Sequence, residues 1–349
     1  MKFVKAMGLL ALSLMLIVAT TTPSLAQGDK GTVYYLAPNL FDEFQTNTKD
    51  ILEKLFKQLG YKVVTVEAQE KADVQLNQLD NAISLKPKAI ILAAVNFDTI
   101  APSIKQARAK GIPVMVFDRL VKNAELDFTS LAGTIEIGRM AGTEIVKMLK
   151  AKNGSAKGKV LSVMGDPGDA YTVDIEAGFQ QIMKDNPGIK VVTKPAMNWE
   201  PDNAAKVVED QLLVNKDIDV IFMHADHLAP PVVAVLKAKG YQKGQMKLLV
   251  SAGMPIGLQL LREGWMDVVV EQPLWGQAYG LAMFAEKVMR GEKLKAGKYD
   301  IIGLPSELTI EKWGPNLKVP GHVITKANVD DPANWGNLKP PSDPVKSVQ

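Results

Sequence analysis

An adjacent acid–base pair, Asp118-Arg119, follows an apolar run at residues 113–117. A charged pair directly after a parallel strand lies at the sheet edge where doubly wound α/β proteins bind ligands. Arginine presents a rigid fork of donors and aspartate presents two acceptor oxygens, so the pair suits vicinal hydroxyls or a carboxylate. The alternative is a salt bridge that only fixes the loop.

A second polar cluster, His224-Ala225-Asp226-His227, follows the apolar run 220–223. Metal binding would require both rings to converge and a third ligand from elsewhere. A hydrolase would need a nucleophile, and the sequence has neither a Gly-x-Ser-x-Gly elbow nor a phosphate-binding glycine loop. We therefore favour histidines that line a loop, and we expect no metal, no cofactor and no enzymatic activity.

Two further features follow predicted strands in the second half of the chain. Trp199 lies between a strand and a helix, where an aromatic ring can stack on the apolar face of a sugar or can cap the core. The segment Gly165-Asp-Pro-Gly-Asp169 occupies the place that Asp118-Arg119 has in the first half. It is either a ligand-binding turn or simply a turn.

The composition excludes several classes of protein. The 349 residues are 47% hydrophobic and 23% charged, which is typical of a globular protein of about two domains. The absence of cysteine excludes a disulfide framework and thiolate metal sites. The 41 basic and 38 acidic residues are too evenly balanced for nucleic-acid binding through a basic surface.

Residues 1–26 resemble a secretory signal peptide. Lys2 and Lys5 precede an apolar run at 7–19, and Ser24-Leu-Ala26 places small residues at the cleavage site. A membrane anchor is the alternative, but the run is short for spanning a bilayer. We expect export to the periplasm and a mature chain that is not inserted in the membrane.

The mature sequence alternates apolar strands with amphipathic helices, in two successive sets. This pattern predicts two α/β lobes, each a doubly wound parallel sheet covered on both faces. The predicted strands are 32–37, 63–66, 89–95, 113–117, 159–164, 189–193, 220–223, 247–251 and 267–271. A helix at 276–289 has no strand left to serve in the second lobe, so it returns to the first. Apolar periodicity fades from Pro305, and we expect residues 338–349 to be loose.

In this order of features the chain resembles the periplasmic sugar-binding proteins of ABC transporters, of the ribose-binding type that shares its fold with the lac-repressor core. The resemblance covers about residues 31–305. Its most specific segments are Phe41-Asp-Glu-Phe44, Gly111-Ile-Pro-Val-Met-Val-Phe-Asp118-Arg119, Gly178-Phe179, His224-Ala-Asp226 and Gln272-Pro273. A signal peptide in place of a helix-turn-helix argues against a repressor.

The resemblance implies a set of ligand-binding positions. It places ligand contacts at Asn39, Phe41, Phe44, Gln45, Asp118, Arg119, Tyr171, Asp174, Trp199, Ala225, Ala252 and Gln272. Several of these depart from the family pattern, because an amide replaces one aromatic ring at Gln45, and Ala225 and Ala252 replace an asparagine and an aspartate. Ala94 and Val173 likewise stand where the family has polar residues. The loss of polar groups favours a deoxy sugar, a small polyol or a larger ligand over ribose or a plain hexopyranose.

The family fold, the type I periplasmic binding protein, has three crossings between its lobes. We expect them near 131–134, 272–273 and 302–305. The expected N-terminal lobe is therefore 31–131 plus 274–304, and the C-terminal lobe is 134–271 plus about 305–330.

Three functions are compatible with these features. The first is a monomeric receptor that closes around a sugar or sugar-like solute and delivers it to an ABC permease. The second is a periplasmic sensor for a chemoreceptor or a histidine kinase, with the same fold and pocket. The third is a secreted enzyme, against which the missing catalytic motifs argue. The sequence does not name the ligand.

Overall fold

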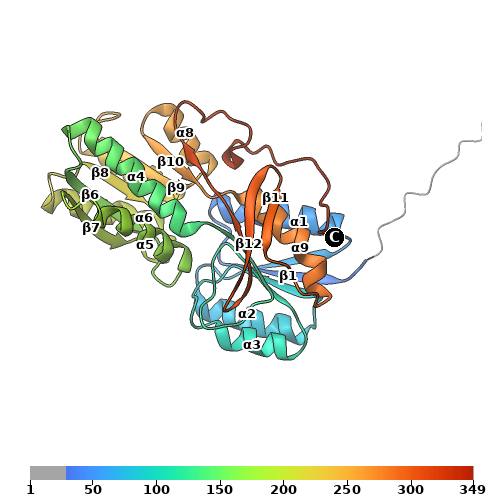
Figure 1. The fold of residues 1–349 in the computed structure, drawn as a ribbon. Helices are drawn as coiled ribbons and strands as arrows, with labels where there is room; N and C mark the ends of the chain where they lie inside the picture. The colour runs from blue at the N-terminus through green and yellow to red at the C-terminus, as the bar shows by residue number, and fades with distance from the viewer. Residues whose placement is uncertain (1–28, 349) are drawn as a thin grey trace, which may run out of the picture.

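The computed structural model describes residues 29–348, and the predicted signal peptide at 1–26 lies outside them. Two parallel-dominated sheets form two lobes that lie side by side (Figure 1). The predicted fold class, two doubly wound α/β lobes, is confirmed.

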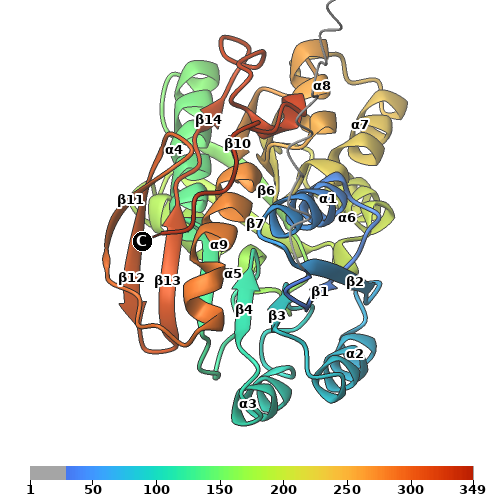
Figure 2. The same ribbon diagram turned by 90° about the vertical axis from the view of Figure 1, so that its right-hand side faces the viewer.

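The first lobe is an eight-stranded sheet in the order β11-β12-β13-β5-β4-β3-β1-β2. Its strands are β1 (Thr32–Ala37), β2 (Lys62–Glu67), β3 (Ala89–Leu92), β4 (Val114–Phe117), β5 (Phe128–Ala132), β11 (Gly297–Ile301), β12 (Leu304–Glu311) and β13 (Gly314–Val319). Helices α1 (Glu43–Gln58) and α9 (Leu274–Met289) cover one face, and α2 (Ala72–Ser84) and α3 (Ala101–Ala109) cover the other (Figure 2). Strands β3 and β4 are fully buried, as expected for central parallel strands.

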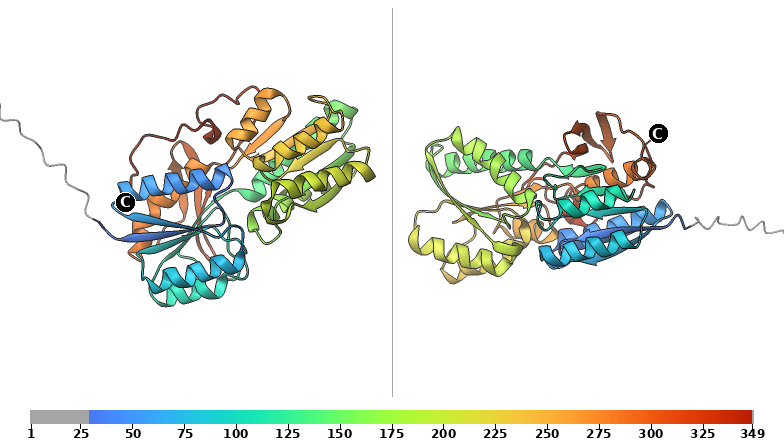
Figure 3. Two further views of the ribbon diagram at one scale, coloured as in Figure 1. Left: turned by 180° about the vertical axis from the view of Figure 1, so that it is seen from behind. Right: turned by 90° about the horizontal axis from the view of Figure 1, so that it is seen from below.

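The second lobe is a six-stranded sheet in the order β14-β10-β9-β8-β6-β7. Its strands are β6 (Gly158–Met164), β7 (Ile189–Pro195), β8 (Val220–Met223), β9 (Lys247–Ala252), β10 (Val268–Glu271) and β14 (Val323–Ile324). Its helices are α4 (Thr134–Asn153), α5 (Ala170–Lys184), α6 (Pro201–Val214), α7 (Ala229–Ala238) and α8 (Pro255–Glu263). Helices α4 and α5 lie on one face and α6 and α7 on the other (Figure 3).

Two of the helices that begin at the cleft, α1 and α5, are capped by aspartates. Asp42 precedes α1, and its carboxylate accepts a hydrogen bond from the Gln45 backbone N–H. Asp169 precedes α5 and accepts from the Tyr171 N–H. Aspartate is a preferred N-cap because it satisfies a backbone donor that the first turn leaves free. The caps therefore fix two carboxylates at the sheet edges that face the other lobe.

The chain passes between the lobes at three places. The first two are at Gly133, between β5 and α4, and at residues 272–273, between β10 and α9. The third is at residues 320–322, between β13 and β14, and not at 302–305 as the sequence suggested. Residues 302–303 instead form the turn between β11 and β12, which pair in the first sheet. The expected boundary at 304 is therefore corrected: residues 304–319 belong to the first lobe.

The weak pattern after Pro305 explains this difference. Strand β11 is the edge strand and β12 is paired next to it, and both are largely exposed or half exposed, so they need few apolar residues. Strand β13 pairs with β5 in parallel, so β5, which we had not predicted, becomes an internal strand. The third crossing is tied to the second by an ion pair, with His322 Nδ1 2.9 Å from Glu271 Oε2.

Residues 341–348 pack against the first lobe, which corrects the expected loose tail over the described part of 338–349. The Tyr279 hydroxyl of α9 donates to the carbonyl oxygens of Pro341 (2.8 Å) and Asp343 (3.2 Å). The Val345 N–H donates to Gln58 of α1, and the Val348 N–H donates to the Met283 carbonyl. These backbone groups provide anchoring that a count of apolar residues does not detect.

Among residues 29–348, no helix is long and apolar enough to cross a membrane.

Two glycines let helices α4 and α5 cross at close range. A Cβ on Gly138 would lie 2.0 Å from the Ile175 carbonyl oxygen, and one on Gly178 would lie 2.0 Å from the Ile135 carbonyl oxygen. Backbone atoms cannot yield as a flexible side chain can. The reciprocal contact therefore requires glycine at both positions for the two helix backbones to approach this closely.

We expect Gly138→Ala to lower the free energy of unfolding by about 1–3 kcal/mol, because the helices must move apart. Gly142→Ala is the graded comparison on the same helix, where the new Cβ would lie 2.9 Å from the Ile182 Cβ and a smaller displacement of the helices relieves the contact. Denaturant titration of both variants measures the difference. Equal losses would show that the helix crossing is not limited by backbone contact.

Candidate functional site

A small cavity of about 30 Å³ lies between the two lobes at the carboxyl ends of their strands. It is lined by Asp42, Phe44, Gln45, Asp118, Arg119, Asp169, Tyr171, Trp199, Ala225, His227, Ala252, Met254 and Gln272. The volume is enough for about two water molecules. The lobes thus meet closely around it.

Direct contacts between the lobes surround the cavity. The Phe97 N–H donates to the Gly168 carbonyl oxygen at 3.0 Å. The Ile256 N–H, in the first turn of α8, donates to Glu43 Oε2 at 3.0 Å. Arg119 Nε lies 3.0 Å from Asp169 Oδ2. The structure is therefore a closed arrangement of the two lobes.

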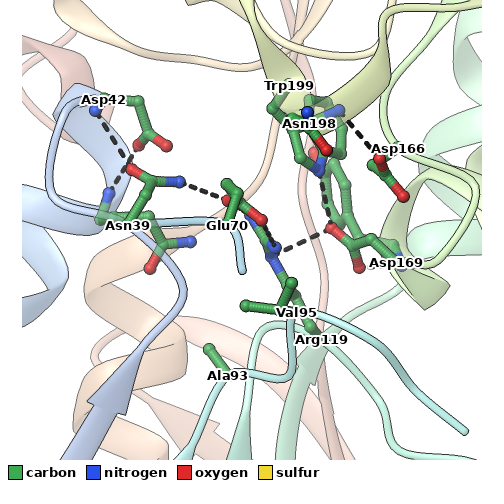
Figure 4. Close-up of polar contacts among 12 residues, drawn as sticks. Asn39, Asp42, Glu70, Ala93, Val95, Arg119, Asp166, Asp169, Asn198 and Trp199 are labelled. Carbon is green, nitrogen blue, oxygen red and sulfur yellow. Dashed lines mark hydrogen bonds and ion pairs between the residues drawn. The ribbon is translucent and has the colours of Figure 1, made fainter. Parts of the chain in front are cut away.

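Arg119 is the centre of the polar network, and its side chain is buried. Glu70 receives two hydrogen bonds from it, from Nη1 to Oε2 (3.0 Å) and from Nη2 to Oε1 (2.9 Å). Asp169 of the second lobe contacts the same guanidinium, with its Oδ2 3.0 Å from Nε (Figure 4). Asn39 in turn donates to Glu70 Oε1 at 2.6 Å. A guanidinium shared by two carboxylates is held rigidly, which orients its remaining N–H groups.

Asp118 holds the first lobe's side of the cavity together. Its backbone φ of 66° is in the left-handed region, directly after β4. Gln45 Nε2 donates to Asp118 Oδ2 at 2.9 Å, and Gln272 Nε2 donates to Oδ1 at 2.7 Å. Burial raises the pKa of Asp118 to about 6, although Arg119 and the two amides oppose this shift. The carboxylate thus links α1 to the second crossing at 272–273.

Asp169 performs the corresponding role in the second lobe. In addition to capping α5, it accepts a hydrogen bond from Trp199 Nε1 at 3.2 Å. Burial raises the pKa of Asp169 to about 8, against the opposing effect of Arg119 and with a smaller contribution from the Asp118 charge. It therefore joins the start of α5, the Trp199 ring and the Arg119 guanidinium of the other lobe at one point.

Aromatic rings form the second lobe's wall. The Trp199 ring lies 6.2 Å from the Tyr171 ring and 6.1 Å from the His227 ring, and the Arg119 guanidinium carbon is 5.8 Å from its centre. Gly165 permits this placement, since a Cβ there would lie 2.2 Å from the indole. A wall of this kind can pack against the C–H face of a sugar or polyol.

Beside the aromatic wall the second lobe presents an apolar patch. Ala225 follows β8, Ala252 ends β9, and Met254 comes just after it. All three side chains are buried and line the cavity. None of them can hydrogen-bond a ligand hydroxyl, so this side of the cavity depends on backbone groups for polarity.

Most of the sequence-predicted site residues meet at the cavity, and three do not line it. Asn39 lies behind Glu70, and its Oδ1 accepts from the backbone N–H groups of Phe41 and Asp42. Phe41 is about half exposed and touches the His227 ring from across the cleft at 6.1 Å. Asp174 is half-buried on α5, and burial raises its pKa while Lys122 and the Thr134 hydroxyl oppose the shift. It lies near the first crossing and outside the cavity.

Five residues of the site lie outside the predicted set. Asp42, Asp169, His227 and Met254 line the cavity, and Glu70 pairs with Arg119. Asp169 and His227 belong to the segments 165–169 and 224–227 that the sequence singled out, and the two aspartates also carry an N-cap signal, since each stands directly before a helix, α1 or α5. Glu70 carries none, because its position depends on a left-handed turn at 69–70, where both φ angles are 53°.

The two histidines of the 224–227 cluster point to different places. His227 lines the cavity, and its Nε2 lies 3.0 Å from the Trp199 carbonyl oxygen. His224 is fully buried in the second lobe, with Nδ1 2.6 Å from the Thr172 hydroxyl and Nε2 3.3 Å from Glu176. Burial raises the pKa of Glu176, but hydrogen bonds and charge from His224 outweigh it and bring the pKa to about 2. Within residues 29–348, no group of three potential ligands is placed to hold a metal ion.

Two α/β lobes, three crossings and a polar, aromatic cavity between the lobes define a protein that closes around a small ligand. The chain matches the periplasmic binding protein domain family over residues 33–293, and it belongs to this family. The resemblance deduced from the sequence motifs is thus confirmed.

Individual relatives agree with this assignment. The chain is 25% identical to the D-xylose-binding periplasmic protein of Escherichia coli K12, over 71% of this chain and 74% of that protein. It is 24% identical to the D-apiose import binding protein of Actinobacillus succinogenes, over 83% and 90%. A carbohydrate transporter solute-binding protein from Agrobacterium radiobacter, solved with D-arabinose, has the same fold, with a TM-score of 0.76 and 21% identity over 89% of this chain and 99% of that one.

We expect Asp169 to make stability depend on pH. Between the ordinary pKa of 3.8 and about 8, the folded protein keeps a proton on Asp169 that the unfolded chain has lost. This group therefore makes the free energy of unfolding fall as pH rises through that range. Asp169→Asn retains the cap and removes the titration, so its stability should fall less steeply than wild type between pH 5 and 8.

Denaturant titrations at several pH values provide the measurement. Asp166→Asn, in the same turn but outside the cavity lining, is the control and should keep the wild-type slope. Parallel pH profiles for wild type and Asp169→Asn would contradict the expected role of the buried carboxyl.

Proposed function

We propose that this protein is a periplasmic receptor that closes around a small sugar, deoxy sugar or polyol and presents the closed form to an ABC permease. The observation that carries the proposal is the Asp118-Arg119 pair, which lies in an inter-lobe cavity with aromatic rings from both lobes around it. The proposed ligand contacts are the residues that line this cavity. Arg119 and Asp118 bind hydroxyls, while Trp199 and Phe44 contact the carbon skeleton.

Closure depends on contacts that a ligand makes with both lobes at once. A ligand shifts an open–closed equilibrium only by its difference in affinity for the two states. Here Gln45 and Asp118 belong to the first lobe, and Trp199 and Ala252 belong to the second. A ligand that touches both sets binds fully only in the closed form, and a permease can read that form.

The apolar patch restricts the ligand class. A hydroxyl buried against Ala225 or Ala252 would lose its water partners, at a cost of about 1–3 kcal/mol for each unpaired group. The small cavity acts in the same direction, since a bulky ligand must push the lobes apart. The apolar patch therefore favours a ligand with fewer hydroxyls on the second-lobe side, and the small cavity favours a small ligand.

The cellular role follows from the family and from the N-terminal sequence. The relatives described above are named as periplasmic and import binding proteins, which supports transport over sensing and over enzymatic activity. Residues 1–26 would direct the chain to the periplasm, and the mature protein would act as a monomer. The proposed partner is a membrane permease with its ATPase.

A calorimetric competition series tests the proposal. The probes are D-ribose, D-glucose and D-galactose on one side, and 2-deoxy-D-ribose, L-fucose, xylitol and erythritol on the other. We expect the second group to bind more tightly. A millimolar probe with a micromolar Kd should raise the free energy of unfolding by about 4 kcal/mol.

Submicromolar binding of ribose or glucose, with no competition from the second group, would contradict the inferred ligand class. Binding by none of these probes in either group would contradict the proposal of a sugar or polyol receptor itself.

Arg119→Ala should reduce the affinity for a binding probe by at least about 100-fold, since charge-assisted hydrogen bonds are lost. It should also lower the free energy of unfolding by about 3–5 kcal/mol, because the buried Glu70 carboxylate loses its cation and Asp169 loses a hydrogen-bond donor. Arg119→Lys keeps the charge without the fork, so it should fold and still bind at least about tenfold more weakly.

Calorimetry and denaturant titration measure both effects. Arg139→Ala removes a half-exposed arginine on α4 and is the control. If the affinity of Arg119→Lys were unchanged, Arg119 would not be part of the binding site.

A further inference from the structure

Trp335 lies in the C-terminal segment 325–338, after the last strand, and its side chain is the largest of the fully buried ones. The segment packs beside α8 of the second lobe. It lies beyond residues 33–293, which match the family. The indole nevertheless reaches the back of the inter-lobe cavity.

Two contacts connect Trp335 to residues that line the cavity. The indole Nε1 donates to the Ala252 carbonyl oxygen at 2.7 Å. The indole makes an edge-to-face contact with the Phe44 ring, with centroids 5.6 Å apart and planes at 83°. Ala252 belongs to the second lobe and Phe44 to the first, so one side chain touches both walls.

Trp335 is itself held firmly. Its backbone N–H donates to Glu271 Oε1 at 2.9 Å, next to the second crossing. The neighbouring Asn334 Nδ2 donates to the Asn328 carbonyl oxygen at 2.8 Å. Gly336 allows the segment to lie against β9, since a Cβ there would lie 2.3 Å from the Gly253 carbonyl oxygen. The indole therefore acts as a fixed support.

Ala252 needs such a support because of its backbone. Its φ of 103° lies in a region that residues with a Cβ rarely adopt, and such conformations persist only where neighbours determine them. Its carbonyl oxygen accepts two hydrogen bonds, from the Gln272 N–H at 3.0 Å and from the Trp335 indole. The second of these comes from outside both sheets.

We propose that Trp335 is a positioning residue of the ligand cavity, which sets the Phe44 ring and the Ala252 backbone and thereby limits how deep a ligand can sit. The effect on the ligand rests on the proposed receptor function. The effect on Phe44 and Ala252 does not.

Two substitutions separate the two contacts. Trp335→Phe keeps a ring against Phe44 and removes the donor to Ala252. Trp335→Ala removes both and leaves a void behind Phe44. Trp265→Ala is the control, because Trp265 is a buried tryptophan of the second lobe whose ring packs against Lys237 and does not line the cavity.

Crystal structures of the three variants without added sugar give the first readout. We expect the Ala252 backbone to shift in both Trp335 variants, and the Phe44 ring to move only in Trp335→Ala. Unmoved Phe44 and Ala252 would overturn the proposal, whether or not any sugar binds. If Trp335→Ala does not fold, Trp335→Phe still tests the Ala252 contact.

The second readout is the ratio of the Kd values for erythritol and L-fucose, measured by calorimetry. Trp335→Ala should shift this ratio at least tenfold in favour of the larger L-fucose, and Trp265→Ala should leave it unchanged. A loss of stability with a constant ratio would show that Trp335 has only a structural role. Failure of both probes to bind wild type would count against the proposed function, and the crystal structures would then decide the role of Trp335 alone.

Discussion

The burial of one guanidinium is the constraint on which the cavity depends. A buried arginine cannot release its proton, so the chain must bring carboxylates to it. The carboxylates come from three separate loops: Glu70 after β2, Asp118 after β4 and Asp169 before α5. Because Asp169 belongs to the other lobe, the same requirement that organises the cavity also holds the lobes together. The amides of Gln45 and Gln272 then follow as hydrogen-bond donors to the two oxygens of Asp118, since Arg119 Nε lies 3.8 Å from Oδ2, beyond hydrogen-bond distance.

The sequence was informative where one physical signal dominates. Central strands such as β3 and β4 are buried on both faces, so an unbroken apolar run predicts them. Strands β11 and β12 are half exposed, and the hairpins they form join the first sheet through the pairing of β13 with the distant β5. For this reason the sequence predicted the third crossing at 302–305, too early in the chain. The ordered end of the chain was missed for a related reason, since its backbone hydrogen bonds leave no hydrophobic pattern.

The same distinction applies to the site. Asp118, Arg119 and Trp199 were predicted because each follows a strand, and such positions meet at the sheet edge. Glu70 was missed because its carboxylate reaches Arg119 only through an unusual left-handed turn that ordinary side chains seldom form. Asp174 was included on sequence proximity, but the helical repeat turns it toward Thr134 instead of the cavity.

The path of the C-terminal segment adds a mechanical consequence. After the third crossing the chain packs on the second lobe as far as Leu338, and from Pro341 it is bonded to α9 of the first lobe (Figure 1). The three peptide units between them span at most about 11 Å when fully extended. This short tether limits how far Leu338 and Pro341 can move apart. An opening that separates these two residues by more than this length must first release the terminal segment from α1 and α9, and the free energy of that detachment then becomes part of the work of admitting a ligand.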